Sequence, residues 1–304
     1  MTPDAATPRR LDFADHRRSL DDNRYIYAVV SRRSRGLSIG VNLNPDKVCN
    51  FDCPYCQVDR HVPGDDRPVD LEVLAAELDA LLAEVGAGTL WDRAPFDTAA
   101  PALRRVNDVA FAGDGEPTAA RCFAEAVEVV GACLDRAATA HGLNGVKLHL
   151  LTNATLLHRP AVRAGVDALH RRGGEVWAKL DAGSQAWFSR VDGTRLSLDR
   201  IVENIAMVAV DHPVVLQCLF PTLDGQGPDA AERAAWAGRL AALIAAGAQL
   251  REVQVTTIAR RPADPRVGPL DLPGLEALAA AARALGLHAV VYPGLAPEHL
   301  PAPS

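Results

Sequence analysis

Three cysteines stand close together in the segment CNFDCPYCQVDR, at Cys49, Cys53 and Cys56. Thiolates at such short spacings bind metals or iron–sulfur clusters, whereas disulfides are rare in a reducing compartment. The other three cysteines lie among apolar neighbours, and we expect them to be buried, unreactive thiols. They are Cys122, Cys133 and Cys218. The chemistry of the chain is therefore expected in the first cluster.

The ligand count separates the possible metal centres. Zinc takes four nitrogen or sulfur ligands in a structural site and three plus water in a catalytic one. The spacing permits zinc on the three cysteines with His61 as a further ligand, although C-x3-C is looser than a usual zinc knuckle. The chain also lacks the C-x2-C-x2-C pattern of two-cluster ferredoxins. The favoured interpretation is a [4Fe-4S] cluster held by three thiolates, with one iron left without a protein ligand.

Elements of an α/β fold must position this loop. The strand-like runs cover residues 37–44, 107–115, 146–154, 175–183, 213–221, 252–260 and 288–294. They are mostly continuous rather than alternating, which is typical of parallel strands covered on both faces. Helical patterns lie between them, at residues 69–85, 119–141, 160–171, 198–210, 229–247 and 273–285. In the first helix Asp70 is a plausible N-cap.

This alternation predicts right-handed βαβ units in a parallel sheet. About six units are present, short of the eight of a complete TIM barrel, so we expect an incomplete (β/α)6 TIM-like barrel. The cysteines follow the first strand-like run, and loops at the carboxyl ends of barrel strands form the active face. The long connection 86–105, which carries Trp91 and Phe96, is predicted to be either a lid or a surface loop pinned by its aromatics.

The cysteine segment resembles the radical S-adenosylmethionine (SAM) enzymes, whose hallmark is C-x3-C-x-aromatic-C. Cys49, Cys53, Tyr55 and Cys56 match each of its elements. The resemblance implies the radical SAM type of barrel, with the three thiolates on three irons. It also implies that the fourth iron chelates the amino and carboxylate groups of SAM.

A second match follows the second strand, in FAGDGEPT. Gly113, Asp114, Gly115, Glu116 and Pro117 resemble the family's GGE motif, with Gly-Asp in place of the first Gly-Gly pair. In that family the backbone and acidic side chain of the motif take the SAM amino group. Glycine allows such close approach of the backbone, and an ammonium needs acceptor oxygens.

Polar residues at later strand ends complete the predicted SAM site. By the same resemblance, Asn153 and Thr155, and then Lys179, Asp181 and Ser184, lie where the SAM carboxylate, ribose or substrate binds. Lys179 and Asp181 are two apart on a strand and so point to one side, either toward a ligand or into a buried ion pair. Weaker candidates are Gln217, Gln254, Thr256 and Arg260.

The likeness narrows to a branch of small single-domain radical SAM proteins related to the wybutosine-synthesis tRNA enzymes. We divide the chain into a charged extension at 1–24, a radical SAM domain at 25–295 and a tail at 296–304. The resemblance implies an electron donor of the flavodoxin or ferredoxin type. The substrate, a small molecule or RNA, is not identified. The alternative is a non-catalytic module that binds zinc or an iron–sulfur cluster.

The charge and the hydropathy of the chain limit the partners that it can be expected to have. The net charge of −6 does not favour a nucleic acid partner, and no DNA partner is expected. A basic footprint for RNA could still form near the start of the chain. Its arginines are Arg9, Arg10, Arg17, Arg18, Arg32, Arg33 and Arg35. No secretory signal and no stretch near the roughly 18 apolar residues of a membrane span is present, so we expect a cytoplasmic protein.

Overall fold

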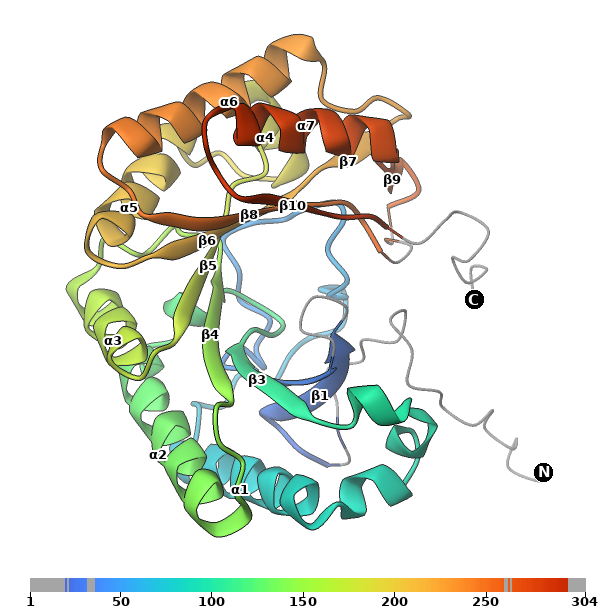
Figure 1. Ribbon diagram of the computed structural model, residues 1–304, viewed down its shortest axis with the longest axis vertical. Coiled ribbons are helices and arrows are strands. Elements are labelled where there is room, and N and C mark those ends of the chain that lie inside the picture. The colour runs from blue at the N-terminus through green and yellow to red at the C-terminus, as the bar shows by residue number, and fades with distance from the viewer. Residues whose placement is uncertain (1–19, 21, 32–35, 260–261, 263, 295–304) are drawn as a thin grey trace.

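The computed structural model describes residue 20 and residues 22–31, 36–259, 262 and 264–294. Within them an eight-stranded sheet curves into an open barrel (Figure 1). The strands in spatial order are β1 (Ile26–Ser31), β2 (Gly36–Val41), β3 (Val106–Phe111), β4 (Lys147–Thr152), β5 (Glu175–Lys179), β6 (Val214–Leu219), β8 (Leu250–Thr256) and β10 (Ala289–Tyr292). β1 and β2 are antiparallel, and every other neighbouring pair is parallel.

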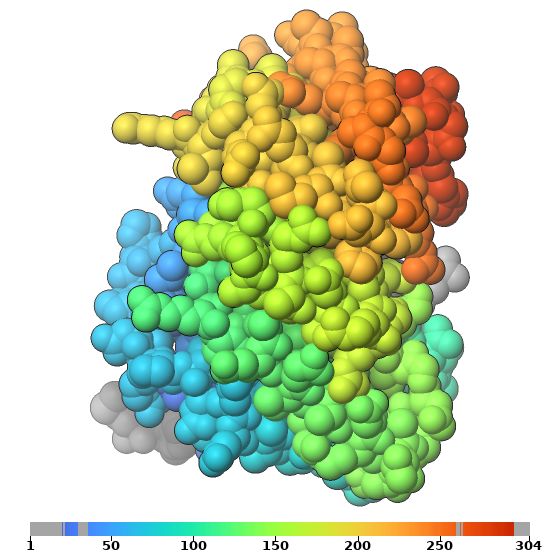
Figure 2. Space-filling model, turned by 90° about the vertical axis from the view of Figure 1, so that its left-hand side faces the viewer, coloured from blue at the N-terminus to red at the C-terminus, as the bar shows by residue number. Residues whose placement is uncertain are grey.

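Helices cover the outside of the sheet (Figure 1), and Figure 2 shows one face of the molecule, on which the green, yellow and orange parts of the chain pack against one another. The helices are α1 (Leu71–Ala87), α2 (Phe123–His141), α3 (Pro160–Arg171), α4 (Gln185–Val191), α5 (Leu198–Asp211), α6 (Ala230–Ala245) and α7 (Leu272–Ala284). Each strand from β2 to β8 in the main sheet is followed by a helix before the next strand of that sheet. The predicted incomplete (β/α)6 barrel is confirmed, with β10 as an added last strand.

The helices begin and end where their sequences predict. Asp70 caps α1, because its side chain accepts hydrogen bonds from the backbone N–H groups of Glu72 and Val73. The apolar stripe of α1 faces inward, with Leu74 and Leu78 fully buried. Such stripes and the outward-facing strand residues form the layer of hydrophobic core between the sheet and the helices.

β5 shows how the sheet divides its two faces. Val176, Ala178 and Leu180 belong to the hydrophobic core, each at most 1% exposed. The alternate residues, which include Trp177 and Lys179, face the barrel interior because side chains alternate along a strand. Along this strand the outer face is therefore wholly apolar, whereas the interior face carries both the Trp177 ring and the charged side chain of Lys179.

The long connection 86–105 forms three short 3-10 helices directly before β3. Trp91 and Phe96 are buried in the core, as expected for a loop pinned by its aromatics. Because the segment precedes β3, it lies at the amino end of the parallel strands, whereas the cysteine loop follows β2 at the carboxyl end. The lid hypothesis is therefore wrong for the cysteine face.

One α-helix and three strands of the described chain were not predicted from the sequence. They are β1, α4 and the two strands of a small antiparallel sheet, β7 (Pro221–Leu223) and β9 (Val267–Pro269). Most of the 1–24 extension, the tail 296–304, Arg260 and the arginines of the proposed RNA footprint lie outside the described residues. In the part of the chain that is described, no helix has both the length and the apolar character to cross a membrane.

Candidate active site

The cysteine loop lies between β2 and α1, at the carboxyl edge of the sheet. Cys49, Cys53 and Cys56 are half-buried and form no disulfide. The loop is anchored by buried aromatic residues between the cysteines: Phe51 packs edge-to-face on Phe188 of α4, with ring centroids 5.5 Å apart. Hydrophobic anchoring thus fixes the loop that carries the three thiols.

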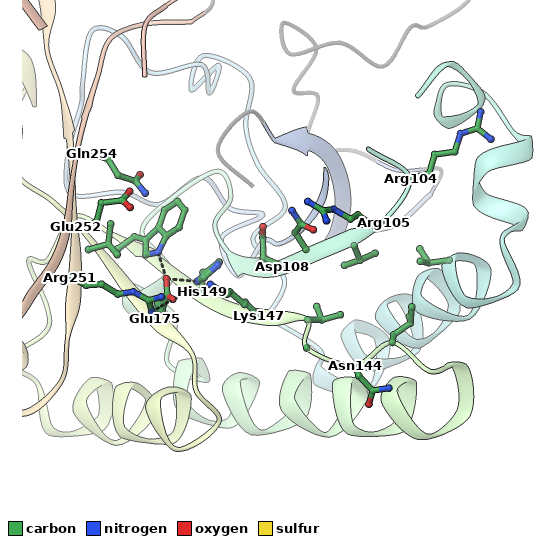
Figure 3. Close-up of a pocket in the computed structure, with 18 of the residues that line it drawn as sticks. Arg104, Arg105, Asp108, Asn144, Lys147, His149, Glu175, Arg251, Glu252 and Gln254 are labelled. Carbon is green, nitrogen blue, oxygen red and sulfur yellow. Dashed lines mark hydrogen bonds and ion pairs between the residues drawn. The ribbon is translucent and has the colours of Figure 1, made fainter. Parts of the chain in front are cut away.

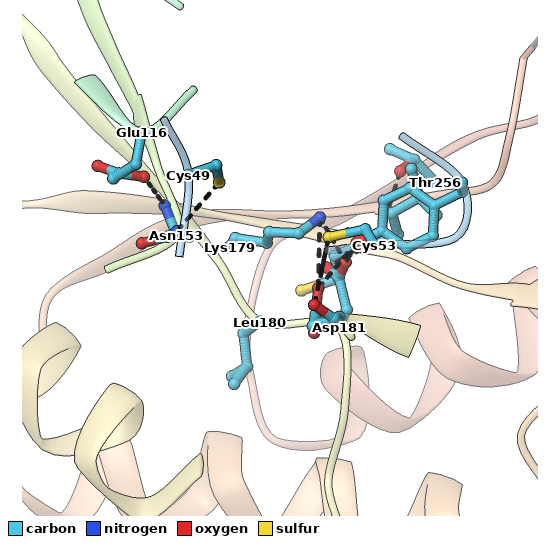
Figure 4. Close-up of polar contacts among 12 residues, drawn as sticks. Cys49, Cys53, Glu116, Asn153, Lys179, Leu180, Asp181 and Thr256 are labelled. Atoms are coloured by element: carbon cyan, nitrogen blue, oxygen red, sulfur yellow. Dashed lines mark hydrogen bonds and ion pairs between the residues drawn. The ribbon is translucent and has the colours of Figure 1, made fainter. Parts of the chain in front are cut away.

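The end of β4 is tied to the same loop. Asn153 donates from Nδ2 to the Asn50 side-chain oxygen at 2.6 Å and to the Cys49 sulfur at 3.9 Å (Figure 4). Asn50 in turn donates to the Thr155 hydroxyl at 2.6 Å. Asn153 therefore lies beside the first cysteine and orients the loop.

The Gly113–Pro117 loop packs directly on the residues that lead into the cysteines. The Glu116 N–H donates to the Val48 carbonyl at 3.2 Å. A side-chain carbon on Gly113 would come within 2.2 Å of the Asn42 side-chain oxygen, and one on Gly115 within 2.0 Å of the Val48 carbonyl oxygen. Both positions require glycine, because a side-chain carbon would overlap the Asn42 side chain at Gly113 and the Val48 backbone at Gly115.

Asp114 and Pro117 complete this second loop. Asn42 donates from Nδ2 to the Asp114 carboxylate at 2.8 Å, and the Asp114 N–H donates back to the Asn42 side-chain oxygen at 3.1 Å. Pro117 is buried and begins a 3-10 turn. The loop is therefore held rigidly beside the end of β2.

The Glu116 carboxylate is bound by the protein itself. It is 2% exposed and accepts hydrogen bonds from the Thr118 hydroxyl at 2.6 Å, the Thr118 N–H at 3.1 Å, the Thr152 hydroxyl at 2.7 Å and the Asn153 N–H at 2.8 Å. Burial raises the pKa of Glu116, and these hydrogen bonds oppose the rise. The carboxylate joins the ends of β3 and β4.

A second polar cluster lies at the end of β5. Lys179 Nζ is 2.5 Å from the Asp181 carboxylate and 4.0 Å from the Asp192 carboxylate, so the predicted same-side placement of Lys179 and Asp181 is confirmed (Figure 4). The Tyr55 hydroxyl donates within this cluster, to Asp181 at 2.6 Å or to Asp192 at 2.8 Å. Lys179 Nζ also lies 4.7 Å from the centre of the Tyr55 ring.

Charge and burial compete within this cluster. Burial lowers the pKa of Lys179, but the Asp181 and Asp192 carboxylates raise it more, so the net shift is upward. Burial and the neighbouring Asp181 charge raise the pKa of Asp192. Burial and the same carboxylates also raise the pKa of Tyr55. The cluster is thus one cation held between two carboxylates beneath the cysteine loop.

Sequence reasoning missed two residues that contact the cysteines. Asp192 follows α4, is 1% exposed, and lies 3.5 Å from the Cys53 sulfur. Arg60 donates to the Cys56 sulfur at 3.4 Å. Asp192 stands in VDGT, which is typical of a turn, and no local pattern marks it. Arg60 lies four residues after the last cysteine, a spacing that could have indicated a charged neighbour.

Ser184, which was also predicted to be a site residue, has a clear structural role at the start of α4. It caps α4, accepting from the Trp187 N–H at 3.2 Å, and its own N–H donates to the Glu232 carboxylate of α6. The structure thus brings Tyr55, the Gly113–Pro117 loop, Asn153, Lys179 and Asp181 around the cysteine loop. Among the described residues, no hydrogen bond joins Ser184 to that loop.

The surroundings of the three cysteines suit an iron–sulfur centre. Burial raises the pKa of the Cys49 and Cys53 thiols, so a thiolate there requires a positive partner, which iron supplies. Arg60 and Asn153 direct N–H groups at two of the sulfurs, as surroundings of iron–sulfur clusters commonly do. Among the described residues, no three His, Cys, Asp or Glu side chains form a set that could hold one metal ion.

An open (β/α)6 barrel with a three-cysteine loop at its carboxyl edge has the fold of the radical SAM enzymes. The chain is similar to a radical SAM methyltransferase from Sphaerobacter thermophilus, with a TM-score of 0.57 and 14% identity over 90% of this chain and 70% of that one. At this identity the likeness defines the fold.

Two further structures are similar over less of the chain. TYW1 with a lysine-pyruvate adduct bound matches with a TM-score of 0.49 and 15% identity, over 82% of this chain and 74% of that one. Archaeal TYW1 matches with a TM-score of 0.39 and 13% identity, over 69% and 62%. No model of a protein family matches the sequence, and no curated protein matches it.

Proposed function

We propose that the chain is a radical SAM enzyme that holds a [4Fe-4S] cluster on Cys49, Cys53 and Cys56. The observation that carries the proposal is the position of these half-buried thiols at the carboxyl edge of a radical SAM barrel. When bound, such a cluster supplies the electron that cleaves SAM reductively, and the resulting 5′-deoxyadenosyl radical abstracts hydrogen from the substrate.

The residues beside the cysteines hold the cluster loop in place. Arg60 donates to the Cys56 sulfur and Asn153 to the Cys49 sulfur, so these two thiolates gain hydrogen bonds. Phe51 and Tyr55 anchor the loop in the core. The protein thereby orders the ligands and limits water at the sulfurs.

We place SAM between the cysteine loop and the Gly113–Pro117 loop. The Glu116 carboxylate is already engaged by four protein donors, so the SAM amino group meets the backbone carbonyls of this loop and Asp114 instead. Glu116 instead stabilises the shape of the loop through the hydrogen bonds that it accepts from these protein groups. The remaining proposed contacts for the SAM carboxylate and ribose are Tyr55, Asn153, Lys179, Asp181 and Ser184.

Reconstitution without oxygen tests the proposal. We expect about four irons and four sulfides per chain, a cluster spectrum that SAM alters, and 5′-deoxyadenosine after reduction. Cys49→Ala, Cys53→Ala and Cys56→Ala should each lose the cluster, while Cys122→Ala should keep it. Stoichiometric zinc with no response to SAM would support the non-catalytic alternative.

The reaction partners belong to the same proposal. The electron donor is a flavodoxin or ferredoxin, and the substrate is a small molecule or RNA. RNA binding through the proposed arginine footprint would weaken steeply as salt concentration rises. Filter binding of tRNA between 50 and about 200 mM salt measures this, and binding that is absent or insensitive to salt would leave a small-molecule substrate.

A further inference from the structure

A cavity of about 780 Å³ lies at the amino end of the barrel, at the opposite end of the strands from the cysteine loop (Figure 3). Its walls are the first residues of β3, β4, β5, β6 and β8, together with the connections before β3 and β4. This volume is in the range of pockets that bind small molecules.

The cavity is lined by polar side chains that are almost fully buried. Asp108 is 5% exposed, His149 is 4% and Gln254 is 3%. Among the described residues, His149 Nδ1 has no hydrogen-bond partner, and its nearest carboxylate oxygen, on Glu175, is 3.7 Å away. Burying an unsatisfied polar group is costly, so His149 is placed for a ligand rather than for packing, whereas Asp108 accepts a hydrogen bond from the Ser38 hydroxyl.

The rim of the cavity supplies more donors than its carboxylates use. Glu175 accepts from Arg251 Nη1, from Trp177 Nε1 at 3.2 Å, and pairs with Lys147 Nζ at 3.5 Å. An arginine carries five N–H donors and a lysine three, so both cations keep donors to offer. Arg105 also lines the cavity, and its side chain forms no bond with other described residues. The lining carries four cations, Arg104, Arg105, Lys147 and Arg251, against the three carboxylates Asp108, Glu175 and Glu252, so it favours an anionic group.

The inner wall supplies aromatic surface. The rings of His149 and Trp177 lie 4.8 Å apart at 35° to each other, and Tyr292 lies on the same lining. Burial lowers the pKa of His149, which leaves its imidazole neutral near pH 7. A flat ring fits such a wall, because aromatic rings gain by offset stacking.

We propose that this cavity is a second ligand site, which binds a small anion carrying an aromatic ring, with the size and chemistry of a nucleoside monophosphate. Its phosphate lies at Arg105, Lys147 and Arg251, and its ring lies toward Trp177. Trp177 stands four residues before Asp181, which is about 13 Å along an extended strand, so the site is separate from the cysteine loop. It requires neither iron nor SAM.

Equilibrium binding to the full chain tests the site, with uridine 5′-monophosphate as the probe. Two of the four tryptophans, Trp91 and Trp177, line the cavity, so ligand binding should change the intrinsic fluorescence. Calorimetry gives the affinity for the nucleotide, for uridine and for inorganic phosphate. We expect saturable nucleotide binding, and weaker binding of uridine and phosphate alone, each by roughly tenfold or more.

Single changes at the rim separate this site from any other. Arg105→Gln and Lys147→Gln should each weaken nucleotide binding by roughly tenfold, because each removes a charged donor. Arg200→Gln, which removes a surface cation on α5, should have no effect. Excess SAM should not displace the nucleotide. Absence of saturable binding, unchanged affinity in both rim variants, or displacement by SAM would overturn the proposal, whatever the result of cluster reconstitution.

Discussion

The buried Glu116 carboxylate gives the sharpest test of how the candidate site is built. Glu116→Gln keeps the shape of the side chain but replaces one carboxylate oxygen with an NH2 group. If the remaining oxygen keeps its hydrogen bonds from the Thr118 and Thr152 hydroxyls, the new NH2 group faces the Asn153 N–H across a contact of 2.8 Å. Two buried donors then oppose each other.

Leaving a buried donor unsatisfied costs about 1–3 kcal/mol, and relief from burying a charge offsets part of it. We expect a net loss of about 2 kcal/mol at pH 7, or a fall of roughly 3 °C in the Tm of a chain of this length. The control is Glu203→Gln, which removes an exposed carboxylate paired with Arg200 and should cost at most about 0.5 kcal/mol.

The pH dependence carries a definite sign. Because the folded pKa of Glu116 lies above its ordinary value of 4.5, its contribution to stability is fully present below pH 4.5 and is lost as pH rises through the folded pKa. The wild-type protein gains this stability on acidification, and the Gln variant does not. The difference in Tm between the two should therefore widen from pH 7 toward pH 5.

Thermal unfolding followed by circular dichroism at several pH values measures both effects. A difference in Tm that narrows on acidification would show a carboxylate stabilised in its charged form and refute the reasoning. If Glu116→Gln instead leaves Tm unchanged and lowers SAM affinity more than a hundredfold, the carboxylate binds SAM rather than the loops.

Three further changes probe the same architecture. Arg60→Gln removes the N–H bond to the Cys56 sulfur and should lower the midpoint potential of the cluster by tens of millivolts in a redox titration; an unchanged potential would exclude the contact in the loaded protein. Gly115→Ala places a carbon within 2.0 Å of the Val48 carbonyl oxygen, so iron incorporation should fall several-fold, and full incorporation would contradict the loop packing. Leu78→Ala empties a fully buried position in α1 and should cost about 2–5 kcal/mol in chemical unfolding; a loss below about 1 kcal/mol would mean that the core closes the gap.

The sequence predicted the barrel because its signals are local. Continuous apolar runs separated by capped helical patterns define strands and helices residue by residue, as Asp70 and α1 illustrate. The cysteine spacing marked the loop in the same way. β1 was missed although its sequence, IYAVVS, is rich in β-branched and aromatic residues; only its antiparallel pairing with β2 depends on a partner strand.

The chemical surroundings of the site were harder to predict. Asp192 reaches Cys53 only because α4 turns the chain back beneath the cysteine loop, and the two residues are 139 positions apart. Glu116 was correctly located in the second loop, but the direction of its carboxylate depends on Thr152 and Asn153, which belong to another strand. Sequence spacing indicates which residues meet, whereas tertiary contacts decide which atoms remain open to a ligand.

The two faces of β5 have a consequence for how the protein can change. Glu175 and Trp177 line the amino-end cavity, Lys179 and Asp181 form the ion pair near the cysteines, and the residues between them fill the core. Each of the seven successive positions 175–181 therefore lines the cavity, forms the ion pair or packs in the core. Because one short strand carries residues of both ends, a substitution in β5 that changes one end of the barrel also acts on a strand that serves the other end. Changes at the two ends are therefore coupled through β5.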